Sequence, residues 1–118
     1  MTDTSGLSVH VIDSVCGTSA QGIRVSLYYK ENTIDEKYTL LVEDETNADG
    51  RVDQLAPDGT LAPGTYKIRF HCLEYFSKQS MTCFYPFCDV VFSVGSYFSH
   101  FHIPLILSPF GYTTYKGV

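Results

Sequence analysis

Hydrophobic and polar residues alternate in short segments along most of this chain, which is the pattern of half-buried β-strands. In each segment, aliphatic or aromatic side chains form one predicted face and polar side chains form the other. Such segments lie at residues 7–12, 25–29, 38–45, 51–54, 66–71, 89–94, 100–107 and 112–116. The pattern therefore predicts about eight short strands.

Turn-forming residues separate these strands. Asn47-Ala48-Asp49-Gly50 predicts a tight turn that leads into a strand at Arg51, and residues 55–64 contain the breakers Pro-Asp-Gly and Pro-Gly. Residues 73–79 are the one segment predicted as helix, because they lack β-branched side chains and connect two strands. Many short strands with turns between them and one short helix predict an all-β fold built as a two-sheet sandwich.

Length and charge narrow the class of protein. With 118 residues, of which 44% are hydrophobic, we expect a single domain over residues 1–118. The net charge of -5, with Lys and Arg scattered singly, argues against nucleic acid and anionic membranes as partners. No apolar run reaches the roughly 20 residues that span a bilayer, and residues 1–6 do not resemble a signal peptide. We therefore expect a cytoplasmic protein.

The four cysteines, Cys16, Cys72, Cys83 and Cys88, are sparse for a disulfide-stabilised domain of this length. None of them forms the paired spacing of a zinc ribbon. We expect reduced thiols that fill the core or lie near the surface.

The first strand of residues 100–118 carries two imidazoles on one predicted face. The period of two puts Phe101 and Ile103 on the apolar side, and His100 and His102 on the other side. Two histidines at this spacing can chelate zinc or copper, but a structural site normally needs four ligands. We therefore expect hydrogen-bonded imidazoles rather than a metal site.

An imidazole with a pKa near 6.5 can take a proton from water at neutral pH, and a nearby cation can stabilise an anion. His10, His102, Arg51 and Lys116 would supply these groups if the fold brought them together. Alternatively, His10 is an ordinary solvent-side strand residue, Arg51 a charge at a turn and Lys116 a solvated charge on an edge strand. Spacing alone does not decide between these interpretations.

Several segments in the same order resemble the transthyretin-like family. Leu-Ser-Val-His-Val-Ile-Asp at residues 7–13 is similar to the opening strand of the family, and residues 46–52 are similar to its central turn. Tyr75-Phe76 and Phe84-Tyr85-Pro86 also fit, and residues 100–118 resemble the family signature. Together these motifs extend over nearly the whole chain.

The resemblance implies a function. The hydrolase branch of this family acts on 5-hydroxyisourate, an intermediate of urate degradation, and needs no cofactor. It implies that His10, Arg51 and His102 are catalytic, with one histidine activating water and Arg51 polarising the substrate carbonyl. It also implies a homotetramer, a dimer of dimers, in which Arg51 binds the substrate together with the tail residues Tyr115, Lys116 and Val118.

The tail departs from the Tyr-Arg-Gly-Ser ending that is typical of the hydrolases. Lys116 keeps the positive charge but lacks the five-donor fork of arginine, and Val118 has no hydroxyl. The chain could thus be an enzyme with altered tail chemistry, or a variant with low activity. A transthyretin-like carrier of small molecules and a non-catalytic module with a vestigial pocket are the alternatives from other classes.

Overall fold

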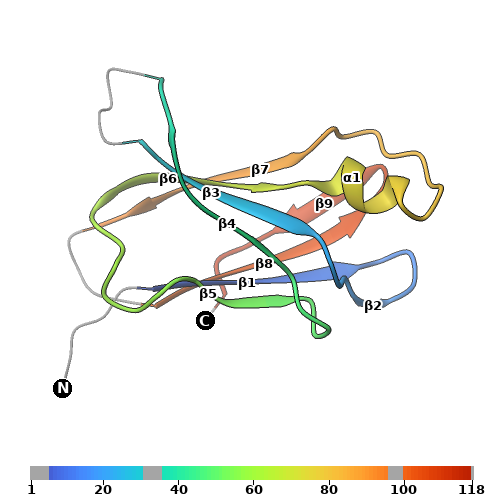
Figure 1. Cartoon of the computed structure of the whole chain (residues 1–118), viewed down its shortest axis with the longest axis horizontal. Helices are drawn as coiled ribbons and strands as arrows, with labels where there is room; N and C mark the ends of the chain where they lie inside the picture. Colours follow the sequence, from blue (N-terminus) through green and yellow to red (C-terminus); the bar gives the residue numbers. More distant parts are fainter. Residues whose placement is uncertain (1–5, 31–35, 96–99, 118) are drawn as a thin grey trace.

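The computed structural model describes residues 6–30, 36–95 and 100–117. These residues form one short helix and nine strands, which are arranged as two layers (Figure 1). The elements are β1 (Gly6–Asp13), β2 (Thr18–Ser19), β3 (Arg24–Lys30), β4 (Thr39–Glu45), β5 (Arg51–Ala56), β6 (Gly64–Phe70), α1 (Cys72–Ser77), β7 (Cys88–Val94), β8 (His100–Ser108) and β9 (Gly111–Thr114).

The first sheet has the order β2-β1-β8-β9, with β5 also paired to β1. β1 and β8 run parallel over their full length, although they come from opposite ends of the sequence. The second sheet has the order β4-β3-β6-β7 and is antiparallel throughout. The predicted all-β sandwich is confirmed.

Alternate residues of the central strands form the core between the sheets, as the period of two predicts. The fully buried side chains are aliphatic or aromatic and come from both sheets. The largest of them are Leu7, Val9, Val11, Ile23, Leu27, Leu55, Tyr66, Ile68, Phe70, Phe76, Leu105 and Leu107. Burying such side chains contributes roughly 1.5–3 kcal/mol each before entropy is counted, so this core holds the two sheets together.

The structure differs from the prediction in β2, in the helix, in β5, which runs on to Ala56, and in the last strand, which ends at Thr114 rather than at residue 116. No strand was predicted where β2 lies, because a two-residue strand is too short to show any periodicity; β2 pairs Ser19 with Ile12 of β1. The helix spans Cys72–Ser77 rather than residues 73–79. It ends early because the Met81 N–H donates to the Phe76 carbonyl across Ser80, whose φ of 58° is left-handed.

The helix is tied to the end of β1 by a partly buried hydrogen bond. The Tyr75 hydroxyl donates a hydrogen bond of 2.8 Å to the carboxylate of Asp13, and burial together with this bond raises the pKa of Tyr75 to about 12. The helix is far shorter than a membrane span, and no other helix occurs among the described residues. All four cysteines carry free thiols.

Candidate active site

Strand register gathers the candidate residues on the outer face of the first sheet. His10 of β1 is paired with Arg51 of β5, and Ser8 of β1 is paired with His102 of β8. Paired residues project to the same side of a sheet, and adjacent strands lie about 4.8 Å apart. Because Ser8 and His10 are two residues apart, all four side chains share one face, opposite the buried Val9.

The turn before β5 fixes the start of that strand at Arg51. The Asn47 side chain accepts hydrogen bonds from the backbone N–H groups of Asp49 (2.9 Å) and Arg51 (3.0 Å). Gly50 has a φ of 72° and lies so close to the Val11 carbonyl that a Cβ at this position would be only 2.6 Å from its oxygen. The turn predicted from sequence is therefore held against β1, and it places Arg51 beside His10.

The Arg51 guanidinium makes neither a hydrogen bond nor an ion pair with any residue of the described ranges. Its positive charge therefore acts on the neighbouring imidazoles. Burial lowers the pKa of His10 and of His102 below the usual 6.5, and the charge of Arg51 lowers both pKa values further. Both rings are therefore held mainly neutral at pH 7, which is the state that can accept a proton.

Serine hydroxyls hold the rings of this face. Ser8 Oγ lies 2.7 Å from Nδ1 of His102 and 2.9 Å from Nε2 of His100, while Ser19 Oγ lies 3.3 Å from Nε2 of His10. At its other nitrogen, Nδ1, His100 lies 3.4 Å from Oδ1 of Asp58. Both imidazoles of β8 thus converge on one hydroxyl, and the described ranges hold no cluster of three or more possible metal ligands.

The C-terminal segment lies against the ring of His102. The Gly117 N–H donates a 2.7 Å hydrogen bond to the His102 carbonyl, and the two residues form an isolated bridge. A Cβ at position 117 would be 2.8 Å from Cδ2 of His102. Only glycine allows the segment to approach the ring this closely.

Successive residues of the C-terminal segment point to opposite faces of the sheet, so the predicted substrate contacts Tyr115 and Lys116 lie on different sides. Leu105 is paired with Thr114 and His102 with Gly117, so the same register puts Tyr115 beside Pro104 and Lys116 beside Ile103. This register directs the Tyr115 side chain toward the imidazole face, although Tyr115 also borders the groove described next. The Lys116 side chain belongs to the opposite face, with its Nζ 5.8 Å from the centre of the Phe101 ring.

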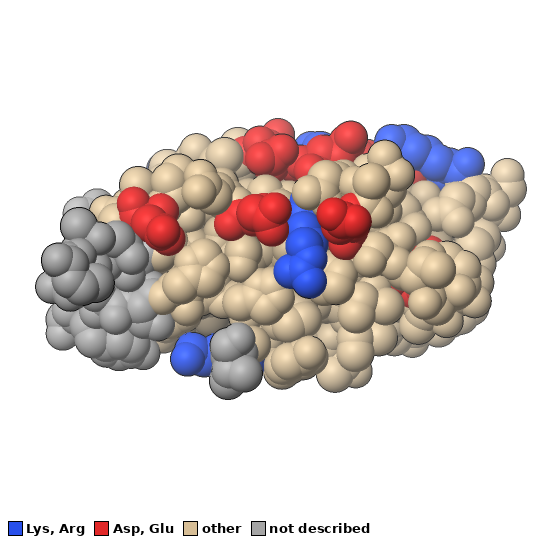
Figure 2. Space-filling model, turned by 90° about the horizontal axis from the view of Figure 1, so that it is seen from below, with Lys and Arg blue, Asp and Glu red and all other residues tan. Residues whose placement is uncertain are grey.

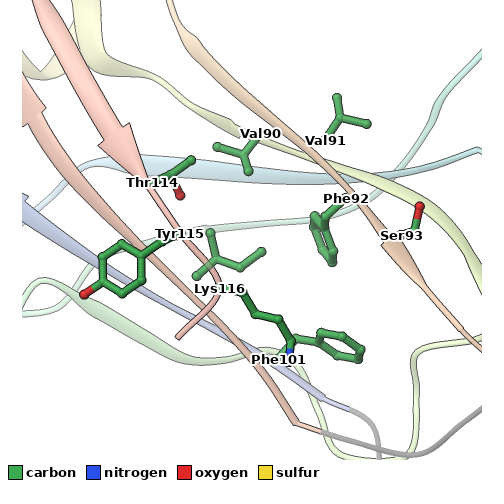
Figure 3. A pocket seen from close by; sticks show the side chains of 9 residues that line it. Val90, Val91, Phe92, Ser93, Phe101, Thr114, Tyr115 and Lys116 are labelled. Atoms are coloured by element: carbon green, nitrogen blue, oxygen red, sulfur yellow. The ribbon is translucent and has the colours of Figure 1, made fainter. Parts of the chain in front are cut away.

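Lys116 lines an apolar groove between β7 and the β8–β9 pair, behind the imidazole face (Figure 3). The groove has a volume of about 280 Å³, and Phe92, Phe101 and Ile103 contribute to its wall. The structure therefore brings His10, Arg51 and His102 together, and does not bring Lys116 to them. Val118 lies outside the described residues.

Sequence reasoning missed Ser8, Ser19 and Asp58 as partners of the histidines. Ser8 shares the period-two face of His10, which was a usable signal. Asp58 lies in the loop before β6, and no sequence pattern connects it to His100.

Figure 2 shows the molecule from the side of β5 and the C-terminal segment. The face is mostly uncharged, with a row of acidic side chains interrupted by a basic one. It does not have the broad positive surface of a protein that binds nucleic acids.

A sandwich in which the first and the penultimate strands run parallel at the centre of one sheet, with imidazoles beside a guanidinium that the described residues leave unpaired, is of the transthyretin-like class. A sequence profile of the HIUase/Transthyretin family matches residues 7–117, and the chain belongs to that family.

Individual relatives agree with this assignment. The chain is 38% identical to the 5-hydroxyisourate hydrolase of Mus musculus over 98% of both sequences. Among solved structures, it is similar to 5-hydroxyisourate hydrolase of Klebsiella pneumoniae, with a TM-score of 0.82 and 28% identity over 97% of this chain and 94% of that one. It is also similar to sea bream transthyretin in complex with thyroxine, with a TM-score of 0.87 and 31% identity over 96% and 95% of the two chains.

Proposed function

We propose that this protein hydrolyses 5-hydroxyisourate to 2-oxo-4-hydroxy-4-carboxy-5-ureidoimidazoline, a step of urate degradation. The observation that carries the proposal is the shared face of His10, Arg51 and His102, where the described residues leave the guanidinium unpaired. The names of the murine and Klebsiella relatives point to the same reaction.

In the proposed mechanism one imidazole, His10 or His102, removes a proton from water as the oxygen attacks the ring carbonyl of the substrate. Arg51 stabilises the negative charge that develops on the carbonyl oxygen. The C–N bond then breaks, and the departing nitrogen takes up the proton from the imidazolium. The reaction uses only acid–base chemistry and charge stabilisation, and we assign no cofactor to it.

The lowered histidine pKa values predict the pH dependence of this reaction. The neutral imidazole is the active form, so activity is lost as the pH falls through the pKa of the folded protein, which lies below 6.5. We expect kcat to be constant around pH 7 and to decline only in more acidic solution. A decline centred above pH 6.5 would contradict the assignment of these histidines as bases.

We propose that Tyr115 and the end of the tail close the pocket beside His102, as the position of Tyr115 next to Pro104 supports. Val118 is proposed as a contact from the resemblance alone. Lys116 faces the groove within a single chain, so we propose no direct contact between its side chain and a substrate bound at His102 of the same chain.

We propose that the protein assembles as a homotetramer, a dimer of dimers. An open sheet face excludes water from a reaction poorly, and a second subunit would enclose it. Many large apolar side chains are exposed on the single chain, including Val91, Ile106, Phe110 and Tyr115. Sedimentation at micromolar concentration should give four chains, and a monomer would contradict the proposal. We also propose a cytoplasmic location, which the four free thiols support.

A carrier function is the second candidate, and one observation favours it. The apolar groove beside Lys116 could hold a small aromatic anion, and sea bream transthyretin, which binds thyroxine in its solved structure, has a similar fold. A carrier needs apolar walls rather than neutral imidazoles next to a guanidinium. The imidazole face therefore supports the hydrolase more than the carrier.

The ultraviolet decay of freshly generated 5-hydroxyisourate, with and without the protein, tests the proposed function. Acceleration that depends on protein concentration and disappears in His102→Asn supports the hydrolase. Unchanged decay together with saturable binding of an aromatic anion would support the carrier.

A further inference from the structure

Three polar residues around His102 have no part in the mechanism above, yet they form a continuous chain. Asp58 contacts Nδ1 of His100 at 3.4 Å, Nε2 of His100 contacts Ser8 Oγ at 2.9 Å, and Ser8 Oγ contacts Nδ1 of His102 at 2.7 Å. Ser8 is only 8% exposed, whereas the side chains of His100 and Asp58 are about half exposed. This hydrogen-bond chain therefore leads from His102 to solvent.

When His100 is neutral, the carboxylate at the outer end fixes which group donates at each hydrogen bond between Asp58 and His102. An ionised carboxylate only accepts hydrogen bonds, so the contact with Asp58 requires a proton on Nδ1 of His100. Neutral His100 then has a lone pair on Nε2, which can only accept, and the Ser8 hydroxyl must donate to it. With its one proton used, Ser8 Oγ must accept from a proton on Nδ1 of His102.

We propose that Asp58, His100 and Ser8 are positioning residues that hold His102 as the Nδ1–H tautomer, so that its Nε2 lone pair is free to take the proton from water. The inference deepens the proposed function and rests on it for the catalytic role of His102. The geometry itself exists whether or not the protein turns over a substrate.

The same series of hydrogen bonds can pass a proton from His102 to His100, because each group gives up one proton as it receives another. When Nε2 of His102 gains a proton from water, the Nδ1 proton can pass to Ser8 Oγ while the Ser8 proton passes to Nε2 of His100. His102 is then neutral again, and the imidazolium of His100 faces the carboxylate of Asp58. Reversing the shift returns the proton to the departing nitrogen of the substrate.

The outer end of the chain depends on Gly6. This residue is paired with His100 in the parallel register of β1 and β8. A Cβ at Gly6 would overlap Oδ1 of Asp58 and would also crowd the Ala56 carbonyl at 3.1 Å. The missing side chain therefore allows the carboxylate to reach His100.

Other charged and titratable groups also act on His102. They are His10 of β1, Arg51 and Asp53 of β5, and His100 of β8 itself. The Arg51 charge opposes protonation of His102, whereas a hydrogen-bond chain that ends in a carboxylate favours it. Breaking the chain at Ser8 should therefore lower the pKa of His102 and move the acid limb of the kcat profile to lower pH.

A matched serine–histidine–carboxylate chain on the second sheet provides the control. The Ser26 hydroxyl donates to Glu43 at 2.6 Å and lies 2.8 Å from Nε2 of His71. Because the carboxylate takes the serine proton directly, His71 must donate from Nε2 and is the opposite tautomer. Ser26 and Glu43 lie on the other sheet and His71 directly follows β6, so Ser26→Ala disturbs a similar network without touching the site.

Kinetics of three variants test the positioning role. We expect Ser8→Ala to lower kcat about tenfold or more with little change in KM, and to shift the acid limb to lower pH. Ser8→Thr keeps the hydroxyl and should restore most of kcat, and Ser26→Ala should leave kcat and its pH profile unchanged. Equal kcat and acid limbs in Ser8→Ala and the unmodified protein would overturn the inference.

Nitrogen NMR of the histidine rings tests the inference without any turnover or substitution. In the unmodified protein near neutral pH, His102 should carry its proton on Nδ1 and His71 on Nε2. An Nε2–H tautomer at His102 would overturn the proposed positioning role of Asp58, His100 and Ser8 even in an active enzyme. If the protein has no hydrolase activity but His102 is the Nδ1–H tautomer, the hydrogen-bond chain is retained and the proposed function is rejected.

Discussion

The outer faces of the two sheets carry the same kinds of side chain in different states of pairing. On the second sheet, Arg69 donates to both oxygens of Asp89 at 2.9 and 3.0 Å and stacks on Phe87, 3.5 Å from the ring centre. Arg24 bridges Glu43 and Glu74 at 3.2 and 3.0 Å. Both guanidinium groups are therefore paired with carboxylates of the protein.

On the first sheet, Arg51 has no such partner among the described residues, and its charge falls on two imidazoles instead. Unpaired charge beside neutral histidines adds nothing to stability, but it leaves a donor for an anionic ligand. The comparison shows that residue type alone does not distinguish a structural face from a working one. The pairing of the residues does.

The histidines should show the largest difference between the faces. His102→Asn or His10→Asn should lower kcat by about two orders of magnitude or more, because each change removes a group that can accept the proton from water. The matched change beside the second sheet, His71→Asn between β6 and α1, should keep kcat and lower only the melting temperature. Steady-state kinetics and thermal melts of the three variants separate these outcomes. Similar losses of kcat in all three would remove the distinction between the faces.

The arginines should show the next largest effect. Arg51→Lys keeps the charge and loses the planar fork, and one lost charged hydrogen bond costs about 1.5–3 kcal/mol, so kcat/KM should fall roughly tenfold to hundredfold. Arg69→Lys loses a bidentate contact to Asp89 and should destabilise the fold without changing kcat/KM. The account fails if Arg69→Lys impairs turnover as much as Arg51→Lys does in folded protein.

Much of this comparison could be predicted from sequence, because alternation determines which side of a strand each residue occupies. The positions of His10 and His102 opposite the apolar face follow from the period of two, and the turn at residues 47–50 correctly predicted where β5 begins. The family resemblance supplied the grouping of His10, Arg51 and His102. Local pattern could not, since the pairing of β1 with both β5 and β8 is a long-range property.

The faces of the C-terminal residues could not be predicted in the same way, because they depend on the pairing of Gly117 with His102. Lys116 and His102 would share a face only if their strands were offset by one residue, and the bridge between Gly117 and His102 excludes that register. The chain from Asp58 to Ser8 was equally hidden, since it joins a loop, β8 and β1.

Gly117 allows a smaller perturbation of the imidazole face. In Gly117→Ala the new methyl group would meet Cδ2 of His102 and turn the ring, so we expect kcat to fall about tenfold while the fold persists. Gly111→Ala is the control, because its Cβ would have Ser108 Oγ as its nearest neighbour at 3.9 Å. An unchanged kcat in Gly117→Ala would show that the tail does not constrain the ring.

Lys116→Arg should have the smallest effect. Its side chain lies over Phe101 in the groove, so kcat/KM should stay within about threefold of the unmodified value although the variant restores the arginine typical of the hydrolases. The kcat/KM of Lys116→Arg is compared with that of Val118→Ser, which changes a position outside the described residues. A tenfold gain from Lys116→Arg alone would place residue 116 in the site, through another subunit or a different tail register.

The most direct test of the central claim is a crystal structure of the protein with urate, a planar and unreactive analogue of the proposed substrate. The account predicts that the analogue binds on the outer face of the first sheet, with Arg51 on one of its oxygens and His10 and His102 within hydrogen-bonding reach. Urate bound in the groove between Phe92, Phe101 and Lys116, with the imidazole face vacant, would contradict it.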